Sequence, residues 1–593
     1  MNPIEIYGER INNLSQTIAI AQRKVNLFSW ARFIVFLLAV FAFYYASKPD
    51  NNSLLYVIIG LALVAGFLYI VKIHANAQYD IKILKNKKEI NAEEIESIHR
   101  RPTTYFDGHI YHQEGSYSND LDIFGPLSLY HIINRCFTKT GQEYLSNQFL
   151  NQPLDDNTAM QRQESIAESI QWLDVRQSFL AHGLEIQNDD SIKAEFQPEK
   201  ALMSISQSKK IKYLRWLPIV ITLITILFYT VNGNNNILLY GFIFNIVIAG
   251  LFLKNTQAII FRCNAELKGL KLLIPAVQSI LSQKPNSTEL QQLLQSCSSG
   301  MMATQELDKS LNLLDSRNNV IVGLLLNGIF GFDLWMTYKI HDWHRKNKTN
   351  IPDWKDAIGR FETIFSLANF AYNNPSYTFP NIQSKGQEIK GHNIRHPFIP
   401  DDKNTGNSFE IGLPFKVMLV TGSNMSGKST FLRAIGVNQI LASCGSVVAA
   451  DEFHTSILPI YSSFRKSDSL QENTSLFFDE IKRLKMIVEA VDKVQSKPAL
   501  VLLDEILRGT NSEDKYYGSK QYILKLLEKN AYTLLATHDL ELSKLEASHS
   551  PGIQNYSFES TIQKDELFFD YKIKKGVAVH KNATFLMEKM GII

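Results

Sequence analysis

Residues 416–433, KVMLVTGSNMSGKSTFLR, place a glycine-rich turn between a short apolar run and a helix-forming segment. Gly422 and Gly427 bracket the GxxxxGKS spacing of a phosphate-binding loop, in which glycine lets successive backbone N–H groups point at phosphate oxygens. The helix that begins near Lys428 adds the positive end of its dipole. We expect Lys428 to contact the β- and γ-phosphates of a nucleoside triphosphate, and the Ser429 hydroxyl to ligate Mg²⁺. The predicted nucleotide-binding residues are Gly422, Ser423, Asn424, Met425, Ser426, Gly427, Lys428, Ser429 and Thr430.

A second apolar run, ALVLLDE at residues 499–505, ends in two acidic residues. Its presence favours a phosphate-binding loop at residues 422–429 over a glycine turn that arose by chance. Such a run is typical of a buried parallel strand whose carboxyl end opens onto a ligand crevice. Asp504 is predicted to hold the Mg²⁺ shell, and Glu505 to orient or deprotonate the attacking water. A third strand, residues 532–537, ends in His538, which could sense the γ-phosphate. The predicted catalytic residues of this nucleoside-triphosphatase are Lys428, Glu505 and His538.

Length and composition set wider limits. A chain of 593 residues should hold several domains, and a formal net charge of +3 argues neither for nor against a nucleic-acid partner. The cysteines are far apart and form no CxxC pair, so neither a zinc site nor a disulfide framework is indicated. They are Cys136, Cys263, Cys297 and Cys444. The polar, helix-like N-terminus does not resemble a removable signal peptide.

Four apolar stretches, arranged in two pairs, predict two transmembrane helical hairpins. The first pair lies at about residues 27–46 and 54–71, and the second at about 216–231 and 237–253. Residues 54–71 carry no charge and would reach about 27 Å as a helix, close to the thickness of the hydrocarbon core. Buried helical hairpins in a soluble protein are the alternative. A fifth apolar run, residues 320–336, contains Asn327 and Asp333 and is predicted to be a buried helix of a soluble helical domain.

Basic residues flank both predicted hairpins, while the connecting turns carry only Lys48. The positive-inside rule therefore predicts a multi-pass membrane protein whose termini and ATPase are cytoplasmic, which suits a bacterial inner membrane. For the lysines beside the hairpins, attraction to anionic lipid is favoured over contact with DNA. The flanking residues are Arg23, Lys24, Lys72, Lys82, Lys85, Lys87, Lys88, Lys209, Lys210, Lys212, Arg215 and Lys254.

Several motifs resemble those of the MutS family of DNA mismatch-repair ATPases. TGSNMSGKSTFLR resembles that family's TGPNMxGKSTxxR loop, although Ser423 replaces a proline. DEILRGTNSED resembles DEIGRGTSTxDG, with Leu507 and Lys515 in place of glycines. ATHDLEL resembles ATHYHEL, and IRHP at residues 394–397 resembles GRHP. The opening of the family's lever domain resembles DIFGPLSLYHIINRCFTKTGQEYLSNQFLNQPLDD, so the likeness covers roughly residues 120–200 and 260–593.

The resemblance implies a multidomain protein: a helical lever and core domain, and an α/β phosphate-loop ATPase domain of the ABC type, to which the two membrane hairpins are added. The expected division is 1–100 for the first hairpin with flanking helices, 101–375 for the helical domain interrupted by the second hairpin, and 376–593 for the ATPase. In that family's dimers, a loop from one ATPase domain completes the site of the other. The resemblance assigns Ser475 to contact with the γ-phosphate in the partner's site, and Glu480 corresponds to a glutamate of the same family segment. The alternative for Ser475 is an ordinary helix cap.

The departures limit how far function carries over. The family's mismatch-reading module, with its Phe-x-Glu wedge, has no counterpart in residues 1–120. We expect a membrane-anchored MutS-like ATPase that hydrolyses ATP with Mg²⁺ at composite sites of a homodimer. Its expected partners are membrane lipids and double-stranded or branched DNA. One alternative is an ATPase redirected to a membrane or protein partner without DNA binding. Another is a scaffold that binds ATP without turnover, but the intact Asp504 and Glu505 argue against it.

Overall fold

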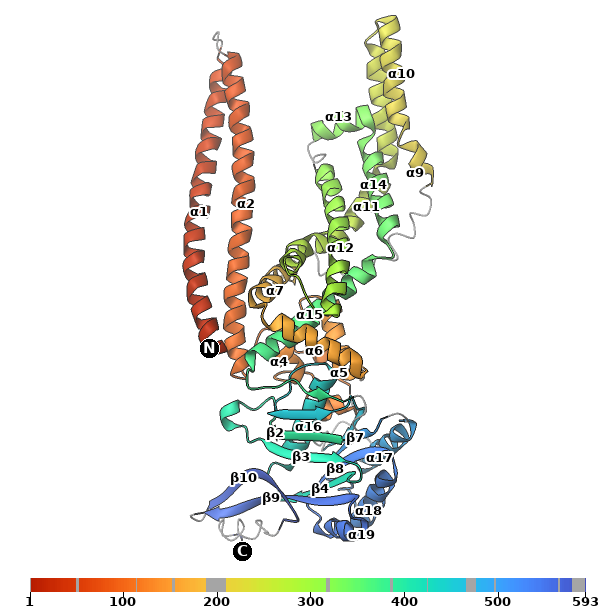
Figure 1. The fold of residues 1–593 in the computed structure, drawn as a ribbon. Coiled ribbons are helices and arrows are strands. Elements are labelled where there is room, and N and C mark those ends of the chain that lie inside the picture. The colour runs from red at the N-terminus through yellow and green to blue at the C-terminus, as the bar shows by residue number, and fades with distance from the viewer. Residues whose placement is uncertain are drawn as a thin grey trace.

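A computed structural model gives the arrangement of the chain (Figure 1). It describes residues 2–48, 53–113, 115–151, 155–187, 209–315, 320–383, 388–423, 425–464, 476–494, 497–563, 566–578 and 592. Two long helical hairpins extend from one side of a helical domain, and two β-sheets with their helices lie on the other side. The ATPase motifs and the apolar hairpins therefore occupy opposite ends of the molecule.

The first hairpin consists of α1 (Pro3–Ala46) and α2 (Ser53–Ile98), which pack along one another. The Asn2 side chain caps α1 by accepting a hydrogen bond from the Ile4 amide over 3.1 Å. Both helices continue well beyond the predicted apolar stretches, because polar residues with helical spacing extend each of them toward the helical domain. The apolar stretches thus form the outer part of a longer antiparallel pair.

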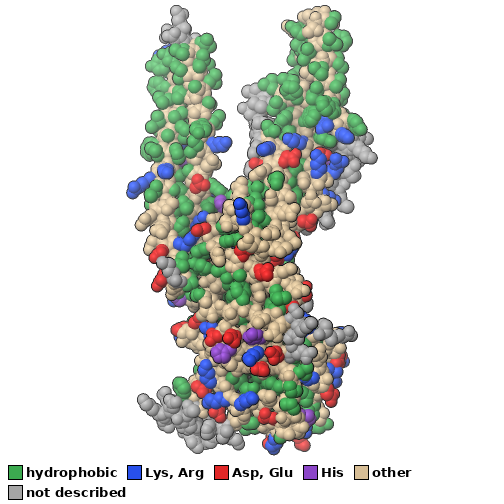
Figure 2. Space-filling model, in the orientation of Figure 1, with side chains coloured by type: hydrophobic (Ala, Val, Ile, Leu, Met, Phe, Trp, Pro, Cys, Tyr) green, Lys and Arg blue, Asp and Glu red, His purple; other side chains and the backbone are tan. Residues whose placement is uncertain are grey.

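The second hairpin consists of α10 (Leu217–Asn232) and the 46-residue helix α11 (Asn236–Leu281), preceded by α9 (Lys209–Leu214). Gly233, at φ 66°, ends α10 in the left-handed region. Within the described residues, three helices are long and apolar enough to cross a membrane by length and composition: α1, α2 and residues 212–232. The run 236–251 is a shorter apolar helix. Figure 2 shows hydrophobic side chains over the outer parts of both hairpins, with Lys and Arg closer to the helical domain.

The helical domain is built from segments before and after the second hairpin. Its core continues without a break into the larger sheet, as buried Tyr130 and Phe361 belong to the same cluster as Val420 and Leu502. Its elements are the 3-10 turn η1 (His109–Tyr111), α3 (Tyr117–Asp120), α4 (Leu129–Ile133), α5 (Lys139–Leu150), α6 (Asp156–Ile170), α7 (Leu173–Gln187), α12 (Thr288–Asp315), α13 (Val320–Phe330), α14 (Phe332–Asn347) and α15 (Ile351–Asn373).

The fifth apolar run differs from its prediction. It is not one buried helix but two, because Gly331 at φ 61° separates α13 from α14. Leu334 and Met336 in α14 are buried as expected, whereas Leu324, Leu325 and Phe330 in α13 are exposed. Hydropathy predicted the helices but not the turn between them, nor which of their side chains would be covered.

The C-terminal part contains two sheets. The smaller has the order β1-β5-β2-β3, and the larger the order β10-β9-β4-β8-β7-β6, in which β9, β4, β8, β7 and β6 run parallel. The strands are β1 (Asn381–Ile382), β2 (Glu388–Ile394), β3 (Asn407–Gly412), β4 (Val417–Gly422), β5 (Glu452–Thr455), β6 (Ile460–Ser463), β7 (Ala499–Asp504), β8 (Ala531–Thr537), β9 (Ile553–Gln563) and β10 (Glu566–Lys575). The helices are η4 (Asp401–Lys403), α16 (Lys428–Ser443), α17 (Leu476–Lys493), α18 (Ser512–Glu528), η5 (Leu540–Lys544) and α19 (Leu545–His549).

Charged contacts join the helical domain to these sheets. Arg433, in the second turn of α16, lies 2.5 Å from the Asp122 carboxylate. Asp156, at the start of α6, accepts hydrogen bonds from the Ile457 amide over 3.0 Å and from the Lys497 ammonium over 2.6 Å. The helix that follows the phosphate loop is therefore tied directly to the helical domain.

Candidate nucleotide-binding site

The predicted phosphate loop connects β4 to α16. Gly422 has φ 152° and Gly427 φ 101°, conformations that L side chains rarely adopt. A Cβ on Gly422 would also lie 2.7 Å from the Phe558 carbonyl oxygen, so glycine is required there sterically. Met425, at φ 66°, is 87% exposed at the outside of the loop. Asn424 lies outside the described residues.

Lys428, the first residue of α16, folds back over the loop. Its ammonium donates to the carbonyl oxygens of Gly422 and Ser423, each over 2.9 Å, and the residue is buried. Burial lowers the pKa of Lys428 to about 8, although Glu505 and Asp504 act in the opposite direction. An anionic phosphate at this position would compensate the buried positive charge that the loop now holds with two carbonyl dipoles.

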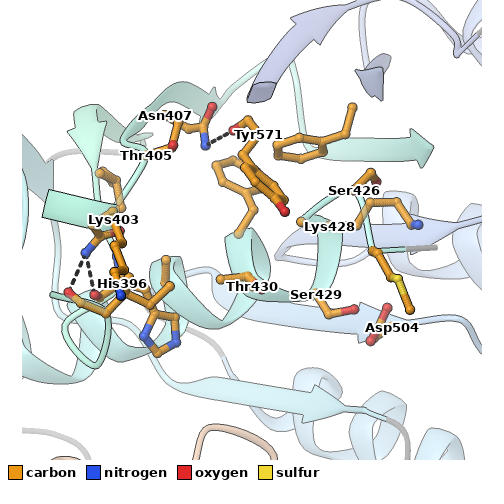
Figure 3. A pocket seen from close by; sticks show the side chains of 18 of the residues that line it. His396, Lys403, Thr405, Asn407, Ser426, Lys428, Ser429, Thr430, Asp504 and Tyr571 are labelled. Carbon is orange, nitrogen blue, oxygen red and sulfur yellow. Dashed lines mark hydrogen bonds between the residues drawn. The ribbon is translucent and has the colours of Figure 1, made fainter. Parts of the chain in front are cut away.

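Two oxygen-bearing side chains lie at the same end of the cavity as Lys428 (Figure 3). Ser429 follows Lys428 in α16, and Asp504, which is buried, is the last residue of β7. Hydroxyl and carboxylate oxygens suit Mg²⁺, which in phosphate sites takes only one or two protein ligands beside phosphate and water. Nearby, the buried hydroxyl of Ser426 has no hydrogen-bond partner among the residues that the structure describes. The side chains present therefore fit a Mg²⁺-bound polyphosphate.

The Glu505 carboxylate lies between the side chains of His538 and Arg508. Its Oε1 lies 2.5 Å from Nε2 of His538, the residue that follows β8, and its Oε2 pairs with the guanidinium of Arg508. Burial raises the pKa of Glu505, but His538, Arg508 and Lys428 together outweigh burial and leave the pKa below its ordinary value. The carboxylate is thus ionised and fixed in direction at neutral pH. The backbone of Glu505 has φ 51°, and its amide donates to Ala536 over 2.9 Å.

The described residues surround a cavity of about 550 Å³, a size typical of sites for small ligands. One end is formed by the phosphate loop with Asp504 and Glu505. The other end is formed by His396, Lys403, Thr405 and other residues between β2 and β3, as Figure 3 shows. This division suits a ligand with a charged polyphosphate end and a less polar end.

The aromatic ring of Tyr571 lies between the two ends (Figure 3). Tyr571 has φ 51°, its ring approaches Gly427, and its carbonyl accepts a hydrogen bond from Asn407 over 3.0 Å. Its half-exposed ring offers an aromatic surface within the cavity, on which a planar base can stack. Sequence reasoning missed Tyr571, because the hairpin-like segment around it carries no chemical pattern.

His396 was also missed as a site residue, although the IRHP motif contains it. It is buried beside Phe398, whose ring centroid lies 4.8 Å from the imidazole centroid. Burial, with a smaller contribution from Arg433, lowers the pKa of His396 to about 4, so it is neutral at physiological pH. Its signal in the sequence was its place in the IRHP motif, which was not linked to the cavity.

Glu480 in α17 supports the loop that follows Glu505. Its Oε1 accepts a hydrogen bond from the Leu507 amide over 2.5 Å. Burial raises the pKa of Glu480 despite this bond. Ser475, which precedes α17, lies outside the described residues.

Comparison with known proteins identifies the C-terminal region. Residues 418–589 match the sequence model of MutS domain V. MutS protein homolog 4 of Homo sapiens is 34% identical over 245 residues, or 38% of this chain and 24% of that protein. DNA mismatch repair protein MutS is 33% identical over 249 residues in Clostridium botulinum and 29% identical over 242 residues in Natronomonas pharaonis. Each of the latter two similarities covers 40% of this chain, and 26% and 27% of the relative respectively.

These similarities support MutS family membership at the level of the ATPase region. The chain spans about a quarter of the length of the curated relatives that it matches. The family match begins within β4 and leaves the hairpins and the helical domain outside it. The activity and partners of the whole relatives are therefore not transferred by similarity alone.

Proposed function

We propose that this chain is a membrane-anchored, Mg²⁺-dependent MutS-like ATPase. The observation that carries the proposal is the convergence of Lys428, Ser429, Asp504 and Glu505 on one cavity within a region similar to MutS domain V. A nucleoside triphosphate would place its phosphates on the loop and its base near Tyr571 and His396. His538 completes the arrangement by contacting Glu505.

Each side chain has a distinct part in the proposed hydrolysis. Lys428 binds and neutralises the β- and γ-phosphate oxygens, and Ser429 and Asp504 would hold Mg²⁺, which supplies further charge neutralisation. Glu505 accepts a proton from the water that attacks the γ-phosphorus, while the bond to the leaving ADP oxygen breaks. His538 and Arg508 keep the Glu505 carboxylate ionised and oriented until the attacking water binds next to it.

We further propose a homodimer in which Ser475 of one protomer contacts the γ-phosphate bound by the other. This proposal rests on the motif resemblance and on the similarity of the region to MutS domain V. The exposure of Met425 at the outside of the loop leaves that side of the site accessible to a second protomer. ATP binding would then close the dimer.

The two hairpins are proposed to anchor the protein in a bacterial inner membrane, with the ATPase and both termini in the cytoplasm. Large apolar side chains are exposed along both, including Leu61 in α2 and Leu223 in α10. Because water-exposed apolar surface on this scale is rare in soluble proteins, lipid is the fitting environment. Lys and Arg near the helical domain suit the cytoplasmic headgroups (Figure 2).

ATP-dependent binding of double-stranded or branched DNA is the first candidate for the output of the cycle, supported by the names of the mismatch-repair relatives. The second candidate is action on a membrane or protein partner without DNA. One contact favours this second candidate. Thr222 in the second hairpin donates a hydrogen bond to the Ile329 carbonyl of α13 over 2.8 Å, and so joins the helical domain to the hairpin.

A binding experiment distinguishes the two candidates. The Glu505→Gln protein in detergent, held with ATP and Mg²⁺ at one near-physiological salt concentration, is titrated with plain, mismatched and branched duplexes. ATP-dependent binding, absent from a Lys428→Ala control, is the expected result for a DNA-acting protein. Binding equal to that control on all three duplexes would exclude DNA as the partner and favour the second candidate.

A further inference from the structure

Helix α13 is apolar except for Asn327, and several of its described side chains are not covered by protein. Its sequence is VIVGLLLNGIF, and Leu324, Leu325 and Phe330 are 46%, 50% and 50% exposed. These exposed side chains do not share one stripe, so a single partner helix would not cover them. A helix that is apolar all round belongs in a protein core or in lipid, and α13 is not in a protein core.

The length and direction of α13 exclude a transmembrane span. Its 11 residues would reach only about 16 Å as a helix, roughly half of the hydrocarbon core. In Figure 1 it lies across the direction of α10 and α11, beside the inner part of that hairpin. Apolar helices of this length outside a protein core are typical of re-entrant or interfacial membrane segments.

Protein donors pair with three backbone carbonyls near the end of α13. The Gly328 carbonyl accepts from the Asn245 side-chain amide over 2.9 Å, and the Ile329 carbonyl accepts from the Thr222 hydroxyl over 2.8 Å. The Asn327 carbonyl accepts from the Gly331 amide over 3.0 Å. Last-turn carbonyls have no partner within their own helix, and in lipid each must find one in the protein. Both side-chain donors come from the second hairpin.

The packing brings α13 close to that hairpin. A Cβ at Gly328 would lie 2.2 Å from the Phe242 ring of α11, so a larger residue would push the helix away. The polar side chain of Asn327 is turned inward, since its oxygen accepts from the Asp333 amide over 2.9 Å and its nitrogen donates to the Gly323 carbonyl over 3.1 Å. Both the oxygen and the nitrogen of the Asn327 side chain therefore have a protein partner.

A cluster of aromatic and cationic side chains indicates how deep in the membrane the contact between α13 and the second hairpin would lie. The Trp216 and Trp335 rings lie 4.9 Å apart, and the Arg215 guanidinium lies 4.4 Å from the Trp335 centroid and 3.8 Å from that of Tyr338. Tryptophan, tyrosine and arginine at the base of an apolar hairpin are typical of the membrane–water boundary. Thr222 lies six residues beyond Trp216, about 9 Å deeper along a helix. The end of α13 therefore lies just inside this boundary.

We propose that α13 inserts into the cytoplasmic leaflet as an interfacial helix and contacts the upper acyl chains and headgroups of phospholipids. This inference rests on the proposed anchoring of the chain by its hairpins. It adds a third membrane contact, located in the helical domain itself between α12 and α14. If the ATPase moved this part of the helical domain, α13 would transmit the movement directly to the bilayer surface.

Fluorescence quenching in vesicles tests this placement. Leu325→Cys and, separately, Phe330→Cys are labelled with the environment-sensitive dye NBD in the full chain, with the unsubstituted chain labelled in parallel to subtract reaction at native cysteines. Leu61→Cys in α2 serves as the membrane control, and Met302→Cys, 62% exposed on α12, as the aqueous control. The vesicles contain phosphatidylethanolamine and phosphatidylglycerol with a doxyl group either near the headgroup or deep in the acyl chain, and iodide serves as the aqueous quencher.

We expect shallow doxyl lipid to reduce the fluorescence at positions 325 and 330 at least about twofold, more than deep doxyl lipid, because interfacial helices lie only about 5–10 Å deep. Leu61→Cys should be quenched more by the deep probe, and Met302→Cys only by iodide. If Leu61→Cys responds to lipid while positions 325 and 330 respond like Met302→Cys, the inference fails and the anchoring stands. If Leu61→Cys also responds only to iodide, both the inference and the proposed anchoring fail.

Discussion

Arg100 donates a hydrogen bond from its Nε to the carbonyl oxygen of Pro397 over 2.8 Å. Arg100 lies two residues beyond the end of α2, and Pro397 directly follows His396, which lines the cavity. The same guanidinium donates to the Asn374 side chain over 2.8 Å. The segment that follows the first hairpin is thus joined by one side chain to the wall of the candidate nucleotide site.

Arg100→Ala is expected to weaken ATP binding, because the segment that carries His396 loses a charge-assisted hydrogen bond. A loss of about 1.5–3 kcal/mol at this contact would raise the Kd for ATP by at most about 150-fold. Equilibrium binding of a fluorescent ATP analogue measures the effect. Arg101→Ala is the matched control, since the side chain of Arg101 forms an exposed pair with Glu96. Equal ATP affinity of both variants and the unsubstituted protein would show that Arg100 does not support the site.

Glu94→Ala is expected to destabilise the contact between α2 and the helical domain. Glu94 and Arg135 form a buried bidentate pair with distances of 2.6 Å and 2.9 Å, and Asn373 adds a third hydrogen bond over 2.7 Å. Burial raises the pKa of Glu94, but Arg135 and the hydrogen bonds outweigh it and lower the pKa. Leaving Arg135 buried and unpaired costs about 3–5 kcal/mol.

Thermal unfolding in one detergent measures that loss. Glu96→Ala, which removes a partner from the exposed pair with Arg101, should change stability by less than about 1 kcal/mol. A melting temperature of Glu94→Ala no lower than that of Glu96→Ala would contradict the assigned role of the buried pair.

ATP affinity should fall as the pH rises above about 8, the value to which burial lowers the pKa of Lys428. Below this pH the free protein already carries the ammonium that phosphate requires. Above it, the lysine is neutral before binding and must take up a proton when phosphate arrives. The affinity then declines by up to about tenfold per pH unit. Titrations between pH 7 and pH 9.5 should show this decline, and Lys428→Ala should bind weakly with no such dependence; the same slope in both proteins would rule out Lys428 as its source.

Asp504→Ala should remove the gain in ATP affinity that Mg²⁺ gives, since this buried carboxylate is the acidic ligand proposed at the Ser429 end of the cavity. ATP binding is compared with Mg²⁺ and with a chelator. Asp402→Ala, which removes an exposed acid beside the cavity residue Lys403, is the control and should keep the full Mg²⁺ effect. A Mg²⁺ effect of unchanged size in Asp504→Ala would place the metal elsewhere.

That the residues of the phosphate-loop end lie together in one cavity could be predicted, because each belongs to a short local pattern. Lys428 and Ser429 follow a glycine turn, and Asp504 and His538 end or follow apolar strands, so parallel pairing of β4, β8 and β7 brings them to one edge. Patterns of this kind need only local geometry and the shared direction of the strands.

The other end of the site could not be predicted in the same way. Tyr571 reaches the cavity because β10 pairs with β9 and β9 with β4, a strand order that no single segment encodes. The wrong prediction for residues 320–336 has a different reason, because Gly331 divides this run into two helices. Hydropathy reports that side chains avoid water, but it does not report whether protein or lipid replaces it.

ATP hydrolysis by Glu505→Gln tests the central claim most directly. The substitution keeps the size of the side chain and removes the charge that His538 and Arg508 hold beside the phosphate loop. We expect turnover to fall by about 10²–10⁴-fold while ATP still binds, because the loss is that of a general base. Glu513→Gln, an exposed acid at the start of α18, should hydrolyse ATP at the unsubstituted rate. Hydrolysis by Glu505→Gln at that same rate would contradict the assignment of this cavity as an ATPase site in which Glu505 activates water.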